Sequence, residues 1–209
     1  MVKYTKPYLW WEITAPYKHY VLFKSDKSPE YTFSFSQGQK LPFDTGKDHL
    51  SYTKRELKDY DFTFYSQVEP DVFKKYDYLL NNKPFLLVNQ KIKSILLELC
   101  SDDVQFFPAI IVPDNPKKMN FENHDYEVLN ITKLVDVFDE NESDLVLYED
   151  GDVQDIKKLR FKENIGDNFF IGRQITKTLS IIASPELVKR FKKDKITGVK
   201  FLKDFEYKG

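Results

Sequence analysis

An imperfect internal repeat constrains the fold more than any other feature of this sequence. When residue n is set against residue n+95 without gaps, two segments match at capping and apolar positions. The matches are Val88 with Ala183, Asn89 with Ser184, Ile92 with Leu187, Leu96 with Phe191, Val104 with Val199, and Phe106 with Phe201. A repeat of this kind marks one supersecondary unit used twice. Chance similarity is the alternative.

Each copy has the pattern of a strand, a helix and a second strand. Apolar strands at residues 85–88 and 179–183 run into Asn89 and Ser184, whose side chains can accept the free amide protons of a first helical turn. Apolar residues at helical spacing follow in both copies, and Pro185 suits the first position of the second helix. Strands at residues 104–112 and 198–205 close the units. One amphipathic helix can then cover one sheet face.

The residues before the first copy are rich in aromatic side chains. Nineteen of the thirty-three aromatic residues precede Leu79. Rings alternate with hydroxyl residues at 31–36, which predicts a strand with a turn at Gln37 and Gly38, and a similar strand is expected near residues 62–64. Residues 70–80 resemble a short helix. We therefore predict an α+β chain, with an aromatic-rich β lobe at 1–84 and a mixed sheet built from the two units at 85–209.

The segment between the copies predicts further strands. Residues 126–134 are rich in β-branched and apolar side chains, and residues 145–147 form a short apolar run. A tight turn is expected at residues 149–152, because Gly151 tolerates a positive φ.

Composition limits the function. The chain has 209 residues, 41% of them hydrophobic and 31% charged, which is typical of a globular protein. Its single cysteine, Cys100, excludes an intramolecular disulfide, and no apolar run reaches membrane-spanning length, so we expect a cytoplasmic protein without a membrane partner. A net charge of −1 makes nucleic acid an unlikely ligand.

No motif for catalysis, a metal or a cofactor stands out. His19, His49 and His124 are widely spaced, and Cys100 follows the apolar stripe of its helix. The chain lacks the glycine-rich loops and nucleophile motifs of common enzymes. An EF-hand-like spacing starts at Asp139, but Asp144 occupies the position that needs glycine. We therefore expect no catalytic residue, no metal and no cofactor.

Charge is distributed unevenly along the chain. Residues 136–155 contain nine acidic residues and no lysine or arginine, whereas residues 157–209 contain fourteen basic residues and six acidic ones. A basic run at 189–195 lies on the expected second helix, where a solvated face is the simpler explanation and a nucleic-acid patch the alternative.

Trp10 and Trp11 are adjacent, so on a strand one ring would be buried and the other free to anchor a partner.

Several segments together resemble immunity protein family 11. They are Val88-Asn89-Gln90 to Leu99, Asp102-Asp103-Val104-Gln105-Phe106-Phe107-Pro108, Tyr126-Glu127-Val128-Leu129-Asn130, Leu134-Val135-Asp136 with Asp139 and Ser143, Ile182-Ala183-Ser184-Pro185-Glu186-Leu187, and Ile196-Thr197-Gly198-Val199-Lys200-Phe201. The resemblance covers residues 85–205. It implies an immunity protein of a bacterial polymorphic-toxin system, which binds and neutralises the toxin of its own cell and has no catalytic residues.

The resemblance makes a cognate toxin domain the expected partner. An acidic loop could imitate phosphate before a basic toxin site and speed encounter. Candidate partner-binding residues are therefore Asp136, Asp139, Glu140, Glu142 and Asp144, together with Trp10 and Trp11. Pairing of these acids with the basic C-terminal third is an equally simple use of their charge. The alternative functions are a nucleic-acid or regulatory binding module and, less favoured, an enzyme with an unrecognised site.

Overall fold

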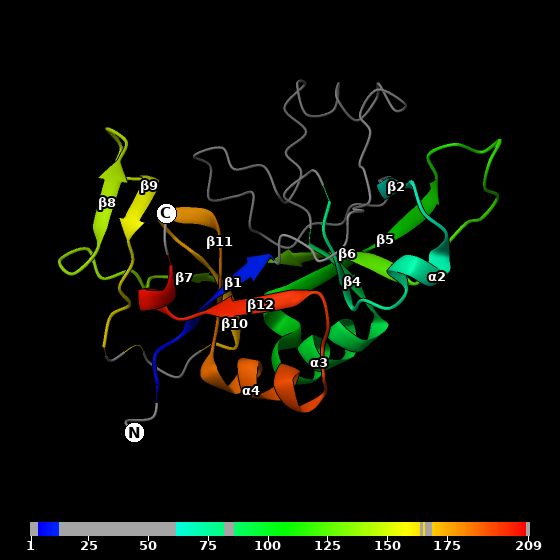
Figure 1. The fold of residues 1–209 in the computed structure, drawn as a ribbon. Helices are drawn as coiled ribbons and strands as arrows, with labels where there is room; N and C mark the ends of the chain where they lie inside the picture. Colours follow the sequence, from blue (N-terminus) through cyan, green and yellow to red (C-terminus); the bar gives the residue numbers. More distant parts are fainter. Residues whose placement is uncertain (1–3, 13–61, 82–85, 164, 166–168, 208–209) are drawn as a thin grey trace.

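The computed structural model describes residues 4–12, 62–81, 86–163, 165 and 169–207, with residues 11 and 12 described by their backbone alone. Mixed sheets and a few helices make the fold α+β, as the sequence predicts (Figure 1). The strand predicted at 31–36 and the turn after it lie outside the described residues. Most of the predicted 1–84 lobe lies there too, so the division of the chain at residue 84 stays a prediction.

The first unit consists of β4 (Leu86–Asn89), α3 (Gln90–Cys100) and β5 (Val104–Pro113). Asn89 caps α3, because its side-chain oxygen accepts the amide protons of Lys91 and Ile92 at donor–acceptor distances of 3.1 and 3.3 Å. The short 3₁₀ helix η3 (Ser101–Asp103) links α3 to β5. β6 (Tyr126–Ile131) lies between β4 and β5 and runs antiparallel to both.

The second unit repeats this arrangement with β11 (Lys177–Ala183), α4 (Pro185–Lys193) and β12 (Val199–Leu202). The Ser184 hydroxyl caps α4 by accepting the Leu187 amide proton at 3.1 Å. β1 (Tyr8–Glu12) takes the place of β6, lying antiparallel between β11 and β12. The internal repeat is therefore confirmed, and the structure adds a strand from outside each copy to its centre.

The two units share their register as well as their order. Val128 in β6 lies opposite Leu87 on one side and Phe107 on the other. Leu9 in β1 lies opposite Ile182 and Leu202. These two residues lie 95 positions after Leu87 and Phe107, respectively. A repeat inferred from six matched pairs of residues thus extends to the strand pairing.

Each unit belongs to a five-stranded sheet. The first sheet has the order β2-β5-β6-β4-β3, with β2 (Phe62–Ser66) parallel to β5 and β3 (Tyr78–Leu79) antiparallel to β4. The second has the order β12-β1-β11-β10-β7, formed with β10 (Ile171–Gln174) and β7 (Leu134–Val135). The strand expected near residues 62–64 is confirmed. The strand expected at 126–134 is divided into β6 and β7.

The helix predicted at residues 70–80 was wrong in its extent. α2 (Pro70–Phe73) is a single turn, after which Tyr78 and Leu79 pair with β4. The Tyr78 ring is 1% exposed and belongs to the core between the two helices. Burial of this ring and pairing of its backbone outweigh the local helical preference.

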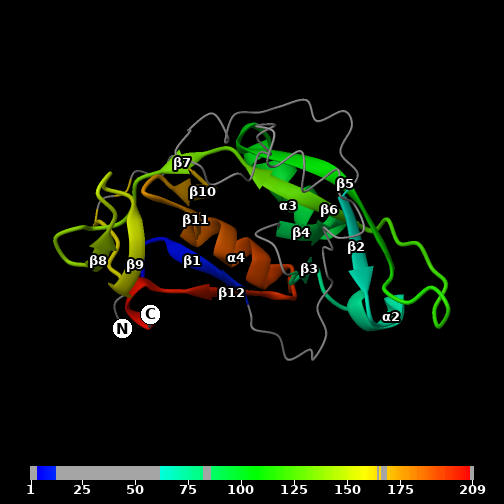
Figure 2. The ribbon, with the colours of Figure 1, turned by 90° about the horizontal axis from the view of Figure 1, so that it is seen from above.

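A small two-stranded sheet lies apart from the two large ones. It pairs β8 (Asp144–Leu147) with β9 (Val153–Lys158), and the turn between them contains Gly151 at φ 88°. This confirms the strand expected at 145–147 and the turn at 149–152. Figures 1 and 2 both place this hairpin at the end of the molecule opposite β2 and α2.

Three apolar clusters hold these layers together. The largest lies between the units and contains the buried faces of α3 and α4 with the inward side chains of both sheets. A second covers the other face of the first sheet and includes Phe64 and Phe73. The third covers the other face of the second sheet, where Leu9 and Ile182 pack with Val153 and Ile156 of the hairpin. The hairpin is therefore anchored to the second unit.

Polar contacts also join the two units. The Asp77 carboxylate accepts protons from the backbone and the hydroxyl of Thr197 at 2.7 and 2.9 Å, and from the Asn89 amide at 2.9 Å. The Arg190 guanidinium of α4 donates two bonds of 2.7 Å to Glu98 of α3. The helix cap of the first unit is thus connected to the loop before β12 in the second.

A short 3₁₀ helix, η4 (Asp204–Glu206), closes the described chain. The buried Asp204 carboxylate accepts the Phe161 amide proton at 3.1 Å and the Tyr4 hydroxyl proton at 3.2 Å. These bonds tie the described N-terminal and C-terminal residues to the chain that follows the hairpin.

Candidate functional site

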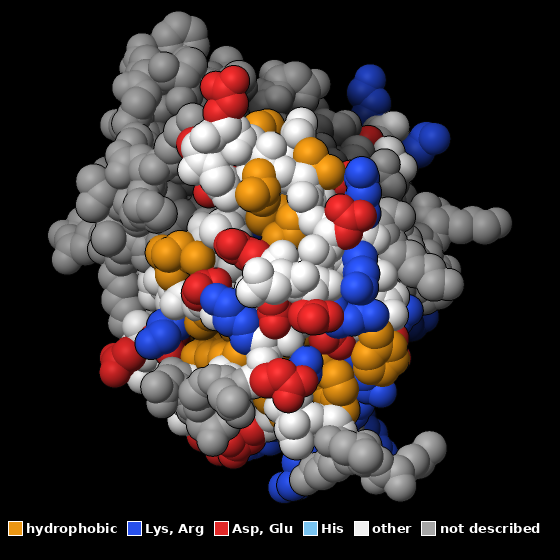
Figure 3. Space-filling view, turned by 90° about the vertical axis from the view of Figure 1, so that its left-hand side faces the viewer, with side chains coloured by type: hydrophobic (Ala, Val, Ile, Leu, Met, Phe, Trp, Pro, Cys, Tyr) orange, Lys and Arg blue, Asp and Glu red, His pale blue; other side chains and the backbone are white. Residues whose placement is uncertain are grey.

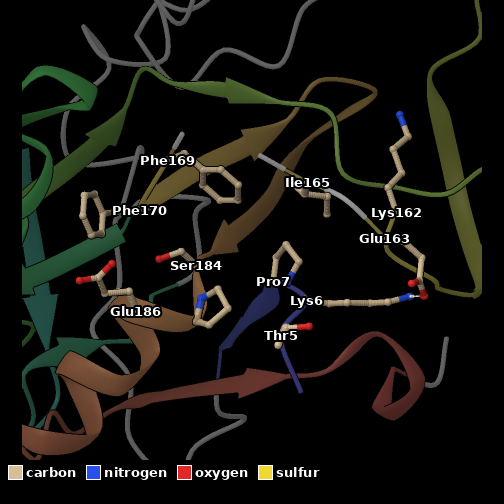
Figure 4. Close-up of a pocket in the computed structure, with 11 residues that line it drawn as sticks. Thr5, Lys6, Pro7, Lys162, Glu163, Ile165, Phe169, Phe170, Ser184 and Glu186 are labelled. Atoms are coloured by element: carbon tan, nitrogen blue, oxygen red, sulfur yellow. Dashed lines mark ion pairs between the residues drawn. The ribbon is translucent and has the colours of Figure 1, made fainter. Parts of the chain in front are cut away.

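A hollow of about 480 Å³ lies beside the start of α4 (Figure 4). Its lining contains neither histidine nor cysteine. Lys6 reaches across it to Glu163 at 3.0 Å and also donates to the Phe161 carbonyl at 3.0 Å. Ser184 caps α4, and Pro185 has no amide proton to offer. The side chains of Lys6, Glu163 and Ser184 are thus engaged in contacts that belong to the fold.

Among the described residues, those most suited to nucleophilic or metal chemistry are not gathered into a site. Cys100 is 7% exposed, and burial raises the pKa of its thiol to about 12, so a thiolate is disfavoured. His124 is exposed and lies 2.7 Å from the Glu122 carboxylate. His19 and His49 lie outside the described residues. In the part of the chain that the structure describes, no three histidine, cysteine or acidic side chains could jointly hold a metal ion.

Two of the candidate acidic residues are engaged by the fold. Asp136 lies 2.6 Å from Lys162 and accepts a bond of 3.4 Å from the Gln174 side chain. Asp139 accepts the amide protons of Asn141 and Glu142 at 3.1 and 3.2 Å, which closes the turn before β8. Pairing with the basic C-terminal third, the alternative use of the charge, is therefore realised by Asp136.

The other three acidic candidates are exposed. Glu140 and Glu142 lie in the turn before β8, and Asp144 begins that strand opposite Lys158. None of the three makes an ion pair of 4.0 Å or less with a described residue. We refer to Glu140, Glu142 and Asp144 as the acidic row. Its three carboxylates are exposed to solvent.

The EF-hand-like spacing does not form a loop around an ion. Asp139 and Asp150 would be its first and last ligands, yet the whole of β8 lies between them. Asp139 uses its carboxylate for the turn described above, and Asp150 accepts the Asp152 amide proton at 3.2 Å at the other end of the hairpin. The two carboxylates stand at opposite ends of a strand and cannot share a cation.

Trp10 was wrongly included among the partner-binding candidates. Its side chain is 4% exposed and makes edge-to-face contacts with Tyr78, Phe191 and Phe201, with ring centroids 5.6 to 6.0 Å apart. It belongs to the core cluster that both units share and is not accessible to a partner. Trp11 is paired with Lys200 through its backbone, and its side chain lies outside the described residues.

Sequence reasoning missed exposed apolar residues at the far end of the hairpin. Leu147 and Tyr148 are 50% and 54% exposed, and Ile175 in the turn between β10 and β11 is 38% exposed. Figure 3 views the side of the molecule that carries the hairpin and shows hydrophobic patches among charged side chains. The apolar run at 145–147 was visible in the sequence, but only the packing decides which of its residues face solvent.

The basic run forms one face of α4. Lys189, Lys192 and Lys193 are exposed, whereas Arg190 pairs with Glu98 and with Asp194. The ammonium group of Lys192 lies 5.9 Å from the centre of the Tyr8 ring. Cations near a helix C-terminus are favoured by its dipole. These contacts agree with the expectation of a solvated helix face.

Comparison with known proteins places the chain in a family. No helix among the described residues is long and apolar enough to span a membrane. No curated protein matches the sequence. A family model does match, over residues 23–204, so the likeness begins well before residue 85, where the resemblance of the segments above begins, and includes most of residues 1–84. The chain belongs to the immunity protein family Imm11.

Proposed function

We propose that this protein neutralises a cognate bacterial toxin by binding it and blocking its action. Family membership is the observation that carries this proposal. The proposed mode of action is steric and electrostatic blockade, in which the immunity protein occupies the working surface of the toxin. No bond is made or broken by the immunity protein itself.

The surface described above supports blockade rather than catalysis. The hollow beside α4 has no histidine or cysteine in its lining, and the Cys100 thiol is buried with a raised pKa. The acidic row, by contrast, is exposed and has no ion-pair partner among the described residues. Exposed carboxylates attract a basic partner over a long range and accelerate its association. We infer that the acidic row steers a toxin with a basic working surface.

Self-protection also requires both proteins to meet in one compartment. A toxin that acts on the producing cell from within would be met in the cytoplasm, and we propose that location for this chain. The acidic row makes a nucleic-acid ligand less suitable, because phosphates would be repelled from it. The exposed lysines of α4 are the observation that keeps a nucleic-acid module as the second candidate.

Co-expression tests the proposal. The toxin gene that neighbours the gene for this chain would be induced in cells with and without it. We expect survival only when both are present, and co-purification of the two proteins. Toxicity that persists while the chain is abundant and folded would contradict the proposal. Binding to nucleic acid at moderate salt, without binding to the toxin, would favour the second candidate.

A further inference from the structure

Two turns that are distant in sequence, the turn of the hairpin β8–β9 and the turn between β10 and β11, form one exposed surface. Leu147 lies opposite Val153, and the Val153 amide donates to the Thr176 carbonyl at 2.8 Å. Thr176 follows Ile175 in the turn between β10 and β11. The exposed apolar residues of both turns are therefore brought to the same end of the molecule. We call this the tip surface and define it by Leu147, Tyr148, Glu149, Asp150, Asp152 and Ile175.

The tip surface is held in place by backbone contacts. The Tyr148 amide donates to the Asp152 carbonyl at 2.8 Å, and the Gly151 amide donates to the Tyr148 carbonyl at 3.0 Å. Lys177 binds the carbonyls of Val153 and Gln154 at 3.2 and 2.9 Å, which joins the two turns a second time. An ordered apolar group loses little conformational freedom on binding, so it contributes more to affinity than a mobile one.

Other exposed large apolar side chains are placed differently. Leu97 lies on α3, away from the acidic residues of 136–155. Phe205 contacts the Tyr4 ring, with centroids 6.0 Å apart, and has the Lys203 ammonium group 5.3 Å from its own centroid. Leu179 is 55% exposed on β11, where its sequence neighbours are Thr178 and Ser180. The tip surface differs from these three residues, because Leu147 and Tyr148 are adjacent and lie next to a turn that carries acidic side chains.

The charge around the tip surface selects the partner. Glu149, Asp150 and Asp152 are all exposed, and residues 136–155 contain no lysine or arginine. Lys177 lies at the same end of the molecule, where its ammonium group donates to the carbonyls of Val153 and Gln154, so the acidic side chains outnumber the basic one there. Such a surface repels nucleic acid and anionic lipid, since both carry phosphate. It suits a protein surface with an apolar hollow and basic side chains around its edge.

We propose that the tip surface is the main contact with the cognate toxin domain, a proposal that rests on the function proposed above. Leu147 and Tyr148 enter an apolar hollow on the toxin, and the three carboxylates pair with lysine or arginine side chains around it. The acidic row, at the other end of β8, contributes to the rate of encounter. Affinity is thus concentrated at the tip surface and steering at the acidic row.

Paired variants of the full chain separate these contributions. Leu147→Ser with Tyr148→Ser would be compared with Leu97→Ser, which removes an exposed leucine elsewhere. We expect the tip variant to raise the Kd for the purified toxin domain at least about 30-fold through faster dissociation, the size of a hot-spot loss. Leu97→Ser should leave the Kd within about twofold. Circular dichroism and a thermal melt would establish that each variant is folded.

A charge series provides the second arm. Glu149→Gln, Asp150→Asn and Asp152→Asn together should raise the Kd by slowing association and speeding dissociation. Glu140→Gln, Glu142→Gln and Asp144→Asn together should slow association about tenfold at low salt and leave dissociation unchanged. If the wild-type chain binds the toxin and both tip variants, the apolar one and the charge one, bind it with the same Kd, the tip-surface proposal is overturned. The immunity function would then still stand. A wild-type chain that does not bind the toxin would overturn both.

Discussion

The two units of this protein are built alike, yet they differ in what covers their outer faces. The outer face of the first sheet, to which β2 contributes Phe64, packs against Phe73 of α2. The outer face of the second sheet packs against the hairpin β8–β9, which carries the acidic row and the tip surface. Order, register and helix capping are common to both units. The common features therefore serve the scaffold, and the hairpin, in which the units differ, carries the proposed contact with the partner.

Substitution of Trp10 should have the largest effect on stability, and it tests whether matching positions of the two units are both central to the core. Trp10 occupies the central strand of the second unit, and Leu129 occupies the matching position in the first, each opposite a phenylalanine. Trp10→Ala should cost about 3–5 kcal/mol of unfolding free energy, and Leu129→Ala about 2–5 kcal/mol. Urea unfolding would measure both. A cost below about 1 kcal/mol at either position would show that it is not a core centre.

Gly198 tests how tightly the second unit packs against the first. Its φ is 87°, and a side chain there would overlap the Tyr78 carbonyl oxygen. Gly198→Ala should therefore cost about 2–4 kcal/mol, from backbone strain and overlap together.

Gly151 is the matched control for this substitution. Its φ is 88°, but nothing lies within 4 Å of the position of an added Cβ. Gly151→Ala should cost only the backbone strain, about 1–2 kcal/mol. Equal thermal shifts for the two variants would contradict the close approach of the units at Tyr78.

The helix caps test a finer difference. Ser184→Ala should cost about 1 kcal/mol through loss of the α4 cap. Asn89→Ala should cost more, because Asn89 also donates to Asp77 at 2.9 Å. Asn89→Ser restores the cap without the Asp77 bond and should fall between the wild-type chain and Asn89→Ala. Chemical denaturation of the three variants would check this order, and identical losses at both caps would remove the linking role of Asn89.

The pair between α3 and α4 should have the smallest effect. Hydrogen bonds from Arg190 hold the pKa of Glu98 below its ordinary value of 4.5. A carboxyl whose pKa is lower in the folded state contributes stability above its unfolded pKa and loses it as pH falls through the folded pKa. The wild-type chain should thus lose slightly more stability than Glu98→Gln below pH 4.5. Thermal melts of both proteins at pH 7 and 3.5 would measure this difference. An equal fall in melting temperature for the two proteins would contradict the pairing.

Much of the scaffold could be predicted from the sequence because local signals and packing agree there. Asn89 and Ser184 mark both helix starts, and the apolar stripes of α3 and α4 face the shared core as their spacing indicates. Residues 70–80 were misassigned because the partner of Tyr78 is β4, which no local pattern shows. The positions of β1 and β6 within the two units could not be read either, because each comes from outside the repeated segment.

The candidate surface was less predictable than the scaffold. The acidic segment is evident from composition, but only the fold shows that Asp136 and Asp139 are engaged while the acidic row is exposed. Adjacent tryptophans gave no way to decide which ring is buried. Ile175 lies far from Leu147 in the sequence, and no pattern joins them before the bond between Val153 and Thr176 is seen.

Hydrogen exchange of the full chain, free and bound to its toxin, tests most directly the claim that the hairpin-bearing unit meets the partner. We predict slower exchange on binding at residues 144–158 and 171–177, with β2, α2 and the exposed face of α3 unchanged. Protection confined to β2 and α2, or to the lysine face of α4, with the hairpin exchanging as in the free chain, would contradict the account.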